Sequence, residues 1–367
     1  MGAASPLIVR VYSSRTEANP RGLDRDQAML HHSTMQQPTI SPIKTAGQKP
    51  TFLEVLSTRS FHYLWLGNGL SDMGDKTLSM VIAWLVLEMT DSKLWVGIIN
   101  GIPAISVVLF SIMGSVMADR ADRRVMVMKA RLALASLTFL AGALVTSGVI
   151  ELWHMVAIAL LAGAVNAIDL PTARTLVFDV VGRKNLLSAN SMNSMARSLG
   201  YIAGATAVGA IIGNWTVDAA LYLLSTVYLI AFLVMLKVRT SYRPPSTQKA
   251  HLLVDLMEGI AYIRRTPPAA WLIALAFTLP FSGVFFSMLP VYARDVLQVG
   301  PQGLGTLMAA FGAGALISSA SLAVHGRLRH QALIMILSGV GFAVGMLALA
   351  FSRSFPLTLV SVFFTGV

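Results

Sequence analysis

Long apolar runs dominate this chain from Phe61 to its last residue, Val367, and only short polar turns separate them. The hydrocarbon core of a bilayer is about 30 Å thick, and a helix of about 20 apolar residues crosses it. Charged residues make up 12% of the chain, whereas a typical soluble domain has about 25%. The mean hydropathy is +0.68. We therefore predict a membrane protein that crosses the bilayer many times.

The apolar runs predict nine membrane spans and the beginning of a tenth. We expect every span to be a helix, because lipid offers backbone groups no partner outside a helix or a closed barrel. None of the runs alternates as the strands of a barrel do. The predicted spans are 61–89, 95–117, 124–148, 153–177, 190–213, 216–237, 270–292, 303–325 and 331–352, and the tenth begins near Phe355.

The segments between the spans predict four parts: 1–60, 61–238, 239–269 and 270–367. The first part is rich in Ser, Thr, Pro and Gln, which predicts a disordered cytoplasmic tail with a short interfacial lead-in to the first span. The second part is an N-terminal half of six helices. The fourth is an incomplete C-terminal half, because residues 355–367 form only about 20 Å of helix.

The third part, the linker, predicts a helix that lies on the membrane surface. It opens with Pro244 and Pro245, which are typical of a connecting segment. Apolar residues then recur at steps of four and three, as on one face of a helix. They are Leu252, Leu256, Ile260 and Ile263. An amphipathic helix at the cytoplasmic surface fits this pattern, and it separates the two halves.

The distribution of Lys and Arg predicts which way the spans run, because cytoplasmic turns are enriched in these residues. The turns that follow even-numbered spans are basic, whereas the opposite turns hold only Lys93, Arg294 and Arg353. We therefore expect the N-terminus in the cytoplasm. The asymmetry accounts for the net charge of +11, so we expect no nucleic-acid partner. The basic residues of the even-to-odd turns include Arg120, Arg123, Arg124, Lys129, Arg131, Arg174, Arg183, Lys184, Lys237, Arg239, Arg264, Arg265, Arg327 and Arg329.

The turn after the second span carries a motif. It runs Gly114-Ser-Val-Met-Ala-Asp119-Arg120-Ala-Asp122-Arg123-Arg124. In physical terms Gly114 permits close helix packing, Asp119 can pair with an arginine or a helix N-terminus, and Asp122 can cap the next helix. The spacing resembles the signature Gly-x(4)-Asp-Arg-x-Gly-Arg-Arg of the major facilitator superfamily, with Asp122 at the usual Gly.

Further segments resemble the enterobactin-exporter-like branch of that superfamily. They are Leu64–Asp75, Asn166–Arg174, Asn190 and Arg197–Gly204. In this branch a Gly-Pro pair associated with antiporters usually stands where this chain has Gly200 and Tyr201. The resemblance implies an all-helical bundle of two six-helix halves, here truncated after the start of the tenth span. It also implies that the motif turn acts as a cytoplasmic gate.

Three charged residues lie near the middle of the first span, where an unpaired charge costs about 2.5–3.5 kcal/mol. They are Asp72, Asp75 and Lys76. Asp72 and Lys76 stand four residues apart, so we expect them to pair on one face of the helix. Asp75 lies off that face, and we predict that it faces the central cavity and binds a proton or the substrate. Asp72 and Lys76 are the further candidates for proton coupling or transport. A purely structural role for Asp75, as a hydrogen-bond acceptor between helices, is the alternative.

Two other groups of residues are expected to matter for function. Asp119, Asp169, Arg174 and Arg197 lie toward the predicted cytoplasmic end, where they would form a charge network that locks one state. Any one of them alone is more often a snorkelling or interfacial charge. Gly200 and Gly204 are spaced for close helix packing.

A secondary transporter fits these features best, and we expect a proton-coupled exporter of a small amphipathic solute, such as a siderophore or a drug, that works by rocking alternating access. Importers and non-transporting receptors or scaffolds on the same fold are the alternatives. The seven His residues show no metal-ligand spacing and no phosphate-binding loop occurs, so we expect no enzyme, metal or cofactor. The expected partners are the lipid bilayer and the solute, and the expected form is a monomer in a bacterial inner membrane.

Overall fold

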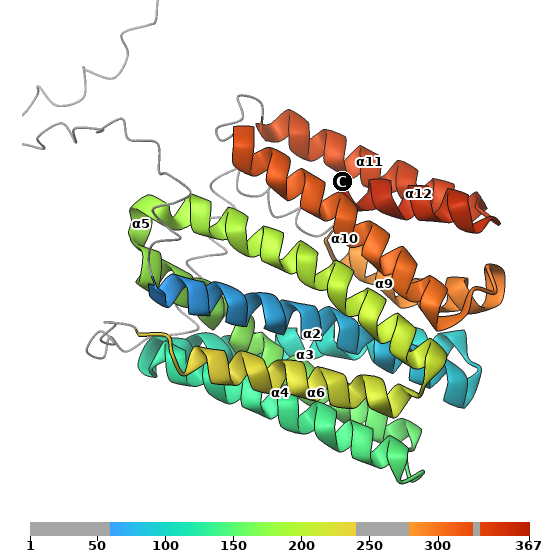
Figure 1. Ribbon diagram of the computed structural model, residues 1–367, viewed down its shortest axis with the longest axis horizontal. Coiled ribbons are helices and arrows are strands. Elements are labelled where there is room, and N and C mark those ends of the chain that lie inside the picture. The colour runs from blue at the N-terminus through green and yellow to red at the C-terminus, as the bar shows by residue number, and fades with distance from the viewer. Residues whose placement is uncertain (1–58, 240–278, 326–330) are drawn as a thin grey trace, which may run out of the picture. The chain divides into compact units, whose positions relative to one another are not determined.

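The fold is taken from a computed structural model of the chain, in which residues 50–367 form one compact unit. The structure describes residues 59–239, 279–325 and 331–367. The predicted tail and the predicted amphipathic helix of the linker lie outside the described residues. Every regular element in the described ranges is a helix, as Figure 1 shows, so the prediction of an all-helical protein is confirmed.

Five helices make up the N-terminal half. They are α2 (Arg59–Thr90), α3 (Lys93–Arg120), α4 (Arg123–Thr146), α5 (Leu152–Asn214) and α6 (Val217–Met235). Their bounds lie within a few residues of the predicted spans, except in α5. Hydropathy locates such helices well, because each must match the thickness of the apolar layer.

The fourth and fifth predicted spans are joined without the loop that we expected between 177 and 190. Both belong to α5, whose helical pattern is interrupted only at Gly182 (φ 70°, ψ 172°). A positive φ of this size is easily reached by glycine, which has no Cβ. The chain therefore bends at a single residue, and the polar segment that follows Gly182 is helical rather than an open turn.

Seven helical segments are long and apolar enough to cross a membrane among the described residues, and α2 is not one of them. Its middle carries Asp72, Asp75 and Lys76, which lower its hydropathy. Sixteen of its 32 residues are buried within the protein. This helix is therefore surrounded mainly by other helices rather than by lipid, which explains how it tolerates the charges.

The second half contains α9 (Leu279–Val291), a short π-helix η1 (Tyr292–Val296), α10 (Gly300–His325), α11 (Gln331–Phe351) and α12 (Phe355–Gly366). The predicted seventh span began at 270, and its described part begins at Leu279. The other bounds agree with the prediction to within about three residues. Pro356 stands in the first turn of α12, where a missing backbone N–H costs nothing.

The two halves meet mainly where α5 and α10 lie side by side (Figure 1). A Cβ added to Gly209 would lie 2.9 Å from the Cα of Gly305. A Cβ added to Gly305 would lie 2.5 Å from the carbonyl oxygen of Ala205. The backbones of the two helices are therefore in direct contact at this crossing, which no larger residue would permit.

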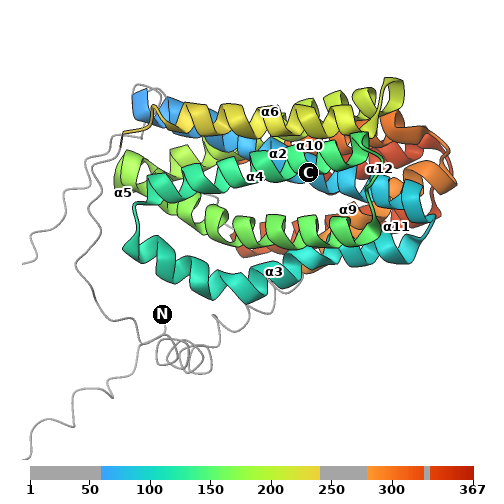
Figure 2. The ribbon, with the colours of Figure 1, turned by 90° about the horizontal axis from the view of Figure 1, so that it is seen from below.

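The predicted packing role of Gly200 and Gly204 is confirmed within the N-terminal half. A Cβ on Gly200 would lie 3.0 Å from the Cβ of Met73, and one on Gly204 would lie 2.6 Å from Oγ1 of Thr77. These two glycines let the second part of α5 approach α2, the helix that carries the buried charges. Figures 1 and 2 show α2 alongside α6, and in Figure 1 it lies between α6 and the second part of α5.

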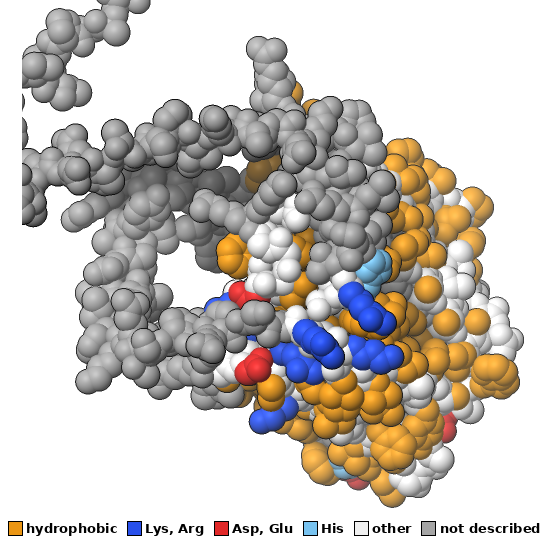
Figure 3. Space-filling view, turned by 60° about the vertical axis from the view of Figure 1, so that its left-hand side comes forward, with side chains coloured by type: hydrophobic (Ala, Val, Ile, Leu, Met, Phe, Trp, Pro, Cys, Tyr) orange, Lys and Arg blue, Asp and Glu red, His pale blue; other side chains and the backbone are white. Residues whose placement is uncertain are grey.

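Basic side chains gather at one end of the described helices, whereas hydrophobic side chains cover most of the rest of the face shown in Figure 3. The first turn of α4 and the segment after α6 lie at this end, and they carry Arg123, Arg124, Lys237 and Arg239. A basic end beside an apolar belt is the arrangement that the charge asymmetry predicted. The prediction that this end faces the cytoplasm remains a prediction.

Candidate functional site

Asp75 is held by a tyrosine from the other side of the N-terminal bundle. The hydroxyl of Tyr228 on α6 donates to Oδ1 of Asp75 on α2, with 2.7 Å between the oxygens. Tyr228 is fully buried. A Cβ on Gly74 would lie 2.6 Å from Cζ of its ring, so the glycine makes room for the tyrosine against α2. Sequence spacing alone gave no sign of this partner.

Asp75 also lines a small cavity of about 50 Å³ between α2, α3 and the first part of α5. This volume is enough for about three or four water molecules. Ser79, Asn100 and Asn166 supply further polar groups to its wall. A carboxyl group in such a place has both a hydrogen-bond donor and room for hydration. That Asp75 also faces the cavity between the two halves remains a prediction.

The expected pair between Asp72 and Lys76 does not form. Oδ2 of Asp72 lies 3.3 Å from Nε of Arg197 on the second part of α5. Nζ of Lys76 instead lies 5.7 Å from the centroid of the Phe286 ring on α9. The prediction was wrong because it considered one helix alone, whereas α5 brings a stronger, planar donor to the carboxylate.

Arg131 is the main functional candidate that the sequence interpretation missed, because it was counted among the basic residues of a turn. Its side chain is fully buried in α4, where Nη2 donates to Oδ1 of Asn68 on α2 at 2.5 Å. Nε and Nη1 have no hydrogen-bond partner. Arg131 follows Arg123, the first residue of α4, by eight residues, or about 12 Å of helix. This distance from the start of the helix was the sequence signal that Arg131 is buried.

The predicted network of Asp169, Arg174 and Arg197 does not form either. Asp169 is buried, and its Oδ1 has no hydrogen-bond partner, whereas Arg174 is exposed. Five residues separate Asp169 from Arg174, which places them about 140° apart around the helix. Arg197 is paired with Asp72 instead. The side chain of Asp119, the fourth member, lies outside the described side chains.

The motif turn forms a different set of bonds. The carboxylate of Asp122 accepts hydrogen bonds from the backbone N–H groups of Arg124 and Val125, so it caps α4 as predicted. Nη1 of Arg123 lies 3.0 and 2.9 Å from the two carboxylate oxygens of Asp179 on α5, a largely buried partner that we did not predict. Gly114, Asp119 and Arg120 lie in the last turns of α3, outside the described side chains.

Arg124 adds a third connection at this end of the bundle. Its Nη2 donates to the carbonyl oxygen of Leu236 at 2.7 Å, just after the last turn of α6. A cation at the C-terminus of a helix is stabilised by the unsatisfied carbonyls there. The motif residues therefore tie α4 to both α5 and α6.

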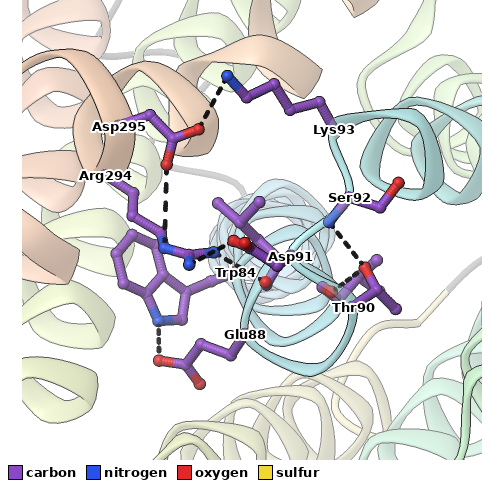
Figure 4. A network of polar contacts seen from close by, with 10 residues as sticks. Trp84, Glu88, Thr90, Asp91, Ser92, Lys93, Arg294 and Asp295 are labelled. Atoms are coloured by element: carbon purple, nitrogen blue, oxygen red, sulfur yellow. Dashed lines mark hydrogen bonds and ion pairs between the residues drawn. The ribbon is translucent and has the colours of Figure 1, made fainter.

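The opposite end of the bundle holds a charge network that joins the two halves (Figure 4). Arg294 of η1 donates to Asp91, in the turn after α2, with 2.6 Å between Nη2 and Oδ1, and to the carbonyl oxygen of Leu87 at 2.8 Å. Asp295 lies 3.1 Å from Nζ of Lys93. Asp91 adopts a left-handed conformation (φ 49°), which an aspartate tolerates better than most residues.

These features define the class of protein. Buried and half-buried charges run along helices that cross an apolar layer, and separate charge networks lie at the two ends of the bundle. No group of three or more His, Asp or Glu residues that could hold a metal occurs in the part of the chain that the structure describes. The arrangement suits a membrane transporter.

The comparisons with known proteins identify the family. Residues 51–367 match the family model described as transmembrane secretion effector, a major facilitator family (MFS_3). The chain belongs to this family, so it is a major facilitator transporter and not an enzyme. The superfamily resemblance of the motif turn is thereby confirmed.

Proteins of similar sequence include the enterobactin exporter EntS of Shigella boydii and of Escherichia coli. Each is 24% identical over 306 residues, which cover 81% of this chain and 72% of the exporter. Among solved structures, a bacterial homologue of the lysosomal transporter Spinster is similar, with a TM-score of 0.63 and 18% identity, over 87% of this chain and 72% of that one. The nucleoside transporter NupG gives 0.63 and 14% identity, over 84% and 79%. These similarities confirm the fold.

Proposed function

We propose that this transporter is a proton-coupled exporter of a small amphipathic solute, and that it works by alternating access. The observation that carries the proposal is Asp75. Its carboxyl group lies in the middle of α2, hydrogen-bonded to a buried tyrosine and beside a small, largely apolar cavity whose wall includes Ser79, Asn100 and Asn166. A carboxyl group at this depth is neutral, paired or hydrated, and a change among these states is what proton coupling requires.

The direction of transport is inferred from the relatives. The enterobactin exporters cover most of this chain, so a siderophore or a similar amphipathic molecule is the first candidate solute. Import is the second candidate, because similarity in fold extends to a nucleoside transporter. We expect a monomer in a bacterial inner membrane with its N-terminus in the cytoplasm.

Transport by the purified protein in proteoliposomes tests the proposal. Enterobactin is placed on one side, a proton gradient is imposed, and accumulation is measured against liposomes without protein. Accumulation that depends on the gradient supports a coupled exporter. Solute counterflow that does not depend on the proton gradient would support a transporter but contradict proton coupling.

Asp75→Asn assigns the coupling to a residue, because asparagine keeps the shape of the side chain but does not titrate. We expect gradient-driven accumulation to fall to background while solute exchange continues. Asp72→Asn is the matched control on the same helix, and it removes the pair with Arg197. If Asp75→Asn accumulates solute as well as the parent does, Asp75 has only a structural role.

A further inference from the structure

Aromatic side chains from both halves meet where α2, α5, α9 and α10 come together. We call them the aromatic cluster: Tyr201, Phe285, Phe286 and Phe311. The ring centroids of Phe286 and Phe311 lie 5.0 Å apart, and those of Tyr201 and Phe286 lie 6.3 Å apart in a stacked arrangement. Such pairs contribute specific ring–ring interactions in addition to burying area. Tyr201 is the residue that replaces the usual proline.

The cluster has a buried side and an accessible side. Phe285 and Tyr201 are 1% and 8% exposed, whereas Phe286 and Phe311 are only half-buried. Lys76 is exposed and stands over the ring of Phe286. The open part of the cluster therefore presents ring surface next to an ammonium group.

The charges near Lys76 do not neutralise it by direct contact. Asp72 is paired with Arg197, so these two charges offset each other. Asp75 accepts its hydrogen bond from α6, and one residue along the helix places its side chain about 100° from that of Lys76. Among the described residues no carboxylate oxygen lies within 4.0 Å of Nζ of Lys76. The ring of Phe286 supplies only a weak substitute for an anion.

We propose that Lys76 and the aromatic cluster form a binding subsite for an aromatic organic anion at the junction of the two halves. The ring system of the solute packs against Phe286 and Phe311, and its carboxylate, sulfonate or phenolate pairs with Lys76. Because no carboxylate lies within 4.0 Å of Nζ of Lys76 among the described residues, this ammonium is available to pair with such a group. This subsite rests on the proposed transport function, since its ligand is the transported solute.

Binding to the purified full chain in phosphatidylcholine nanodiscs tests the subsite directly. The probes are 2-naphthoate, its neutral amide 2-naphthamide and the cation 2-naphthylmethylammonium, which share one ring system. Equilibrium dialysis measures saturable binding after subtraction of empty nanodiscs. We expect the parent protein to bind the anion at least tenfold more tightly than the amide, and the cation least.

Variants at position 76 separate charge recognition from packing. Lys76→Gln should weaken naphthoate binding about tenfold or more and leave the amide within twofold, because only the charge-assisted bond is lost. Lys76→Arg should keep the preference for the anion, and Lys76→Glu should reverse it toward the cation. Lys237→Gln is the matched control, since Nζ of Lys237 lies 5.6 Å from the Tyr63 ring outside the cluster. Lys237→Gln should leave the binding of all three probes unchanged.

Phe286→Leu tests the aromatic part of the subsite. It should weaken all three probes by a similar factor of several-fold, because the ring surface is shared by every probe. Equal binding of the three probes to the parent would overturn the proposal. A Lys76→Gln variant that loses the anion and the amide equally would also overturn it, since Lys76 would then act through packing.

Transport assays on the same variants distinguish this proposal from the proposed function. Selective binding of naphthoate without any solute transport in proteoliposomes would contradict the proposed transport function and support the subsite. If Lys76→Gln does not affect enterobactin transport and the three probes bind equally, the result would contradict the subsite and support the proposed transport function.

Discussion

Arg294 and Asp91 connect the two halves of the protein, with 2.6 Å between Nη2 and Oδ1. One residue follows α9 and the other follows α2, more than 200 positions apart in the chain. Arg294 also donates to the carbonyl oxygen at the end of α2. These bonds hold the halves together at the end opposite the motif turn, so they stabilise one conformation against any state that opens there.

Arg294→Gln should shift the conformational equilibrium toward that open state. The pair is largely solvent-exposed on the Asp91 side, at 81%, so we expect a population change of only about two- to fivefold. Spin labels at Leu94→Cys and Val296→Cys report the distance between the halves, because both positions are exposed and the chain has no cysteine. Lys93→Gln, which removes the pair with Asp295 but leaves the bonds of Arg294 to Asp91 and Leu87 in place, is the control and should shift the distances less.

Tyr228→Phe should slow transport while the solute still binds, because it removes the hydroxyl that donates to the carboxyl group of Asp75. The buried ring stays in place, so the stability loss should be about 1 kcal/mol. Tyr222→Phe is the matched control on the same helix, where the hydroxyl faces Thr146 at an exposed position. Thermal melting and solute counterflow measure the two effects. Unchanged counterflow in Tyr228→Phe would contradict the role of the Tyr228 hydroxyl in positioning Asp75.

Asn68 should matter to stability mainly through Arg131. Asn68→Leu removes the one hydrogen bond that the described part of the chain gives the buried guanidinium of Arg131, so we expect a loss of about 2–3 kcal/mol and a melting temperature several degrees lower. In an Arg131→Met background the same change should cost far less, because no buried charge remains. Thermal melting of the parent, the two single variants and the double variant in detergent gives the coupling energy between Asn68 and Arg131. Additive losses would show that the two residues act independently.

The orientation of the helices is tested by labelling single cysteines in intact cells. Arg239→Cys, just after α6, should react only when the cytoplasmic face is exposed, and Val149→Cys, between α4 and α5, should react from outside. Both positions are exposed in the structure. Labelling of both from the same side would contradict the predicted topology.

The sequence predicted the helices far better than the bonds between them. Span positions follow from local hydropathy, so α3, α4 and α6 lie where they were expected. Side-chain partners depend on which helices are neighbours and how each is rotated, and neither is readable from one helix. Asp72 therefore paired with Arg197 rather than with Lys76, and Arg123 found Asp179.

The sequence analysis missed two features, the burial of Arg131 and the bend at Gly182. Arg131 resembled a turn residue by composition, but its position well inside α4 already implied a buried cation that needs a partner. The bend at Gly182 was hidden, because the polar residues after it are typical of a loop and also form helix. In both cases the surroundings in three dimensions decided the outcome.

The glycine contact between α5 and α10 has a mechanical consequence. At Gly209 and Gly305 the two halves touch through backbone atoms. Interlocked side chains resist rotation because every small displacement makes them collide, whereas two smooth surfaces at van der Waals distance turn against each other at little cost. We expect rotation of the halves to be easiest about this contact. Gly209 and Gly305 lie five residues from the end of α5 and from the start of α10, at the end of the bundle that holds Arg294. Such a rotation should therefore move the motif turn, at the far end, over the greatest distance.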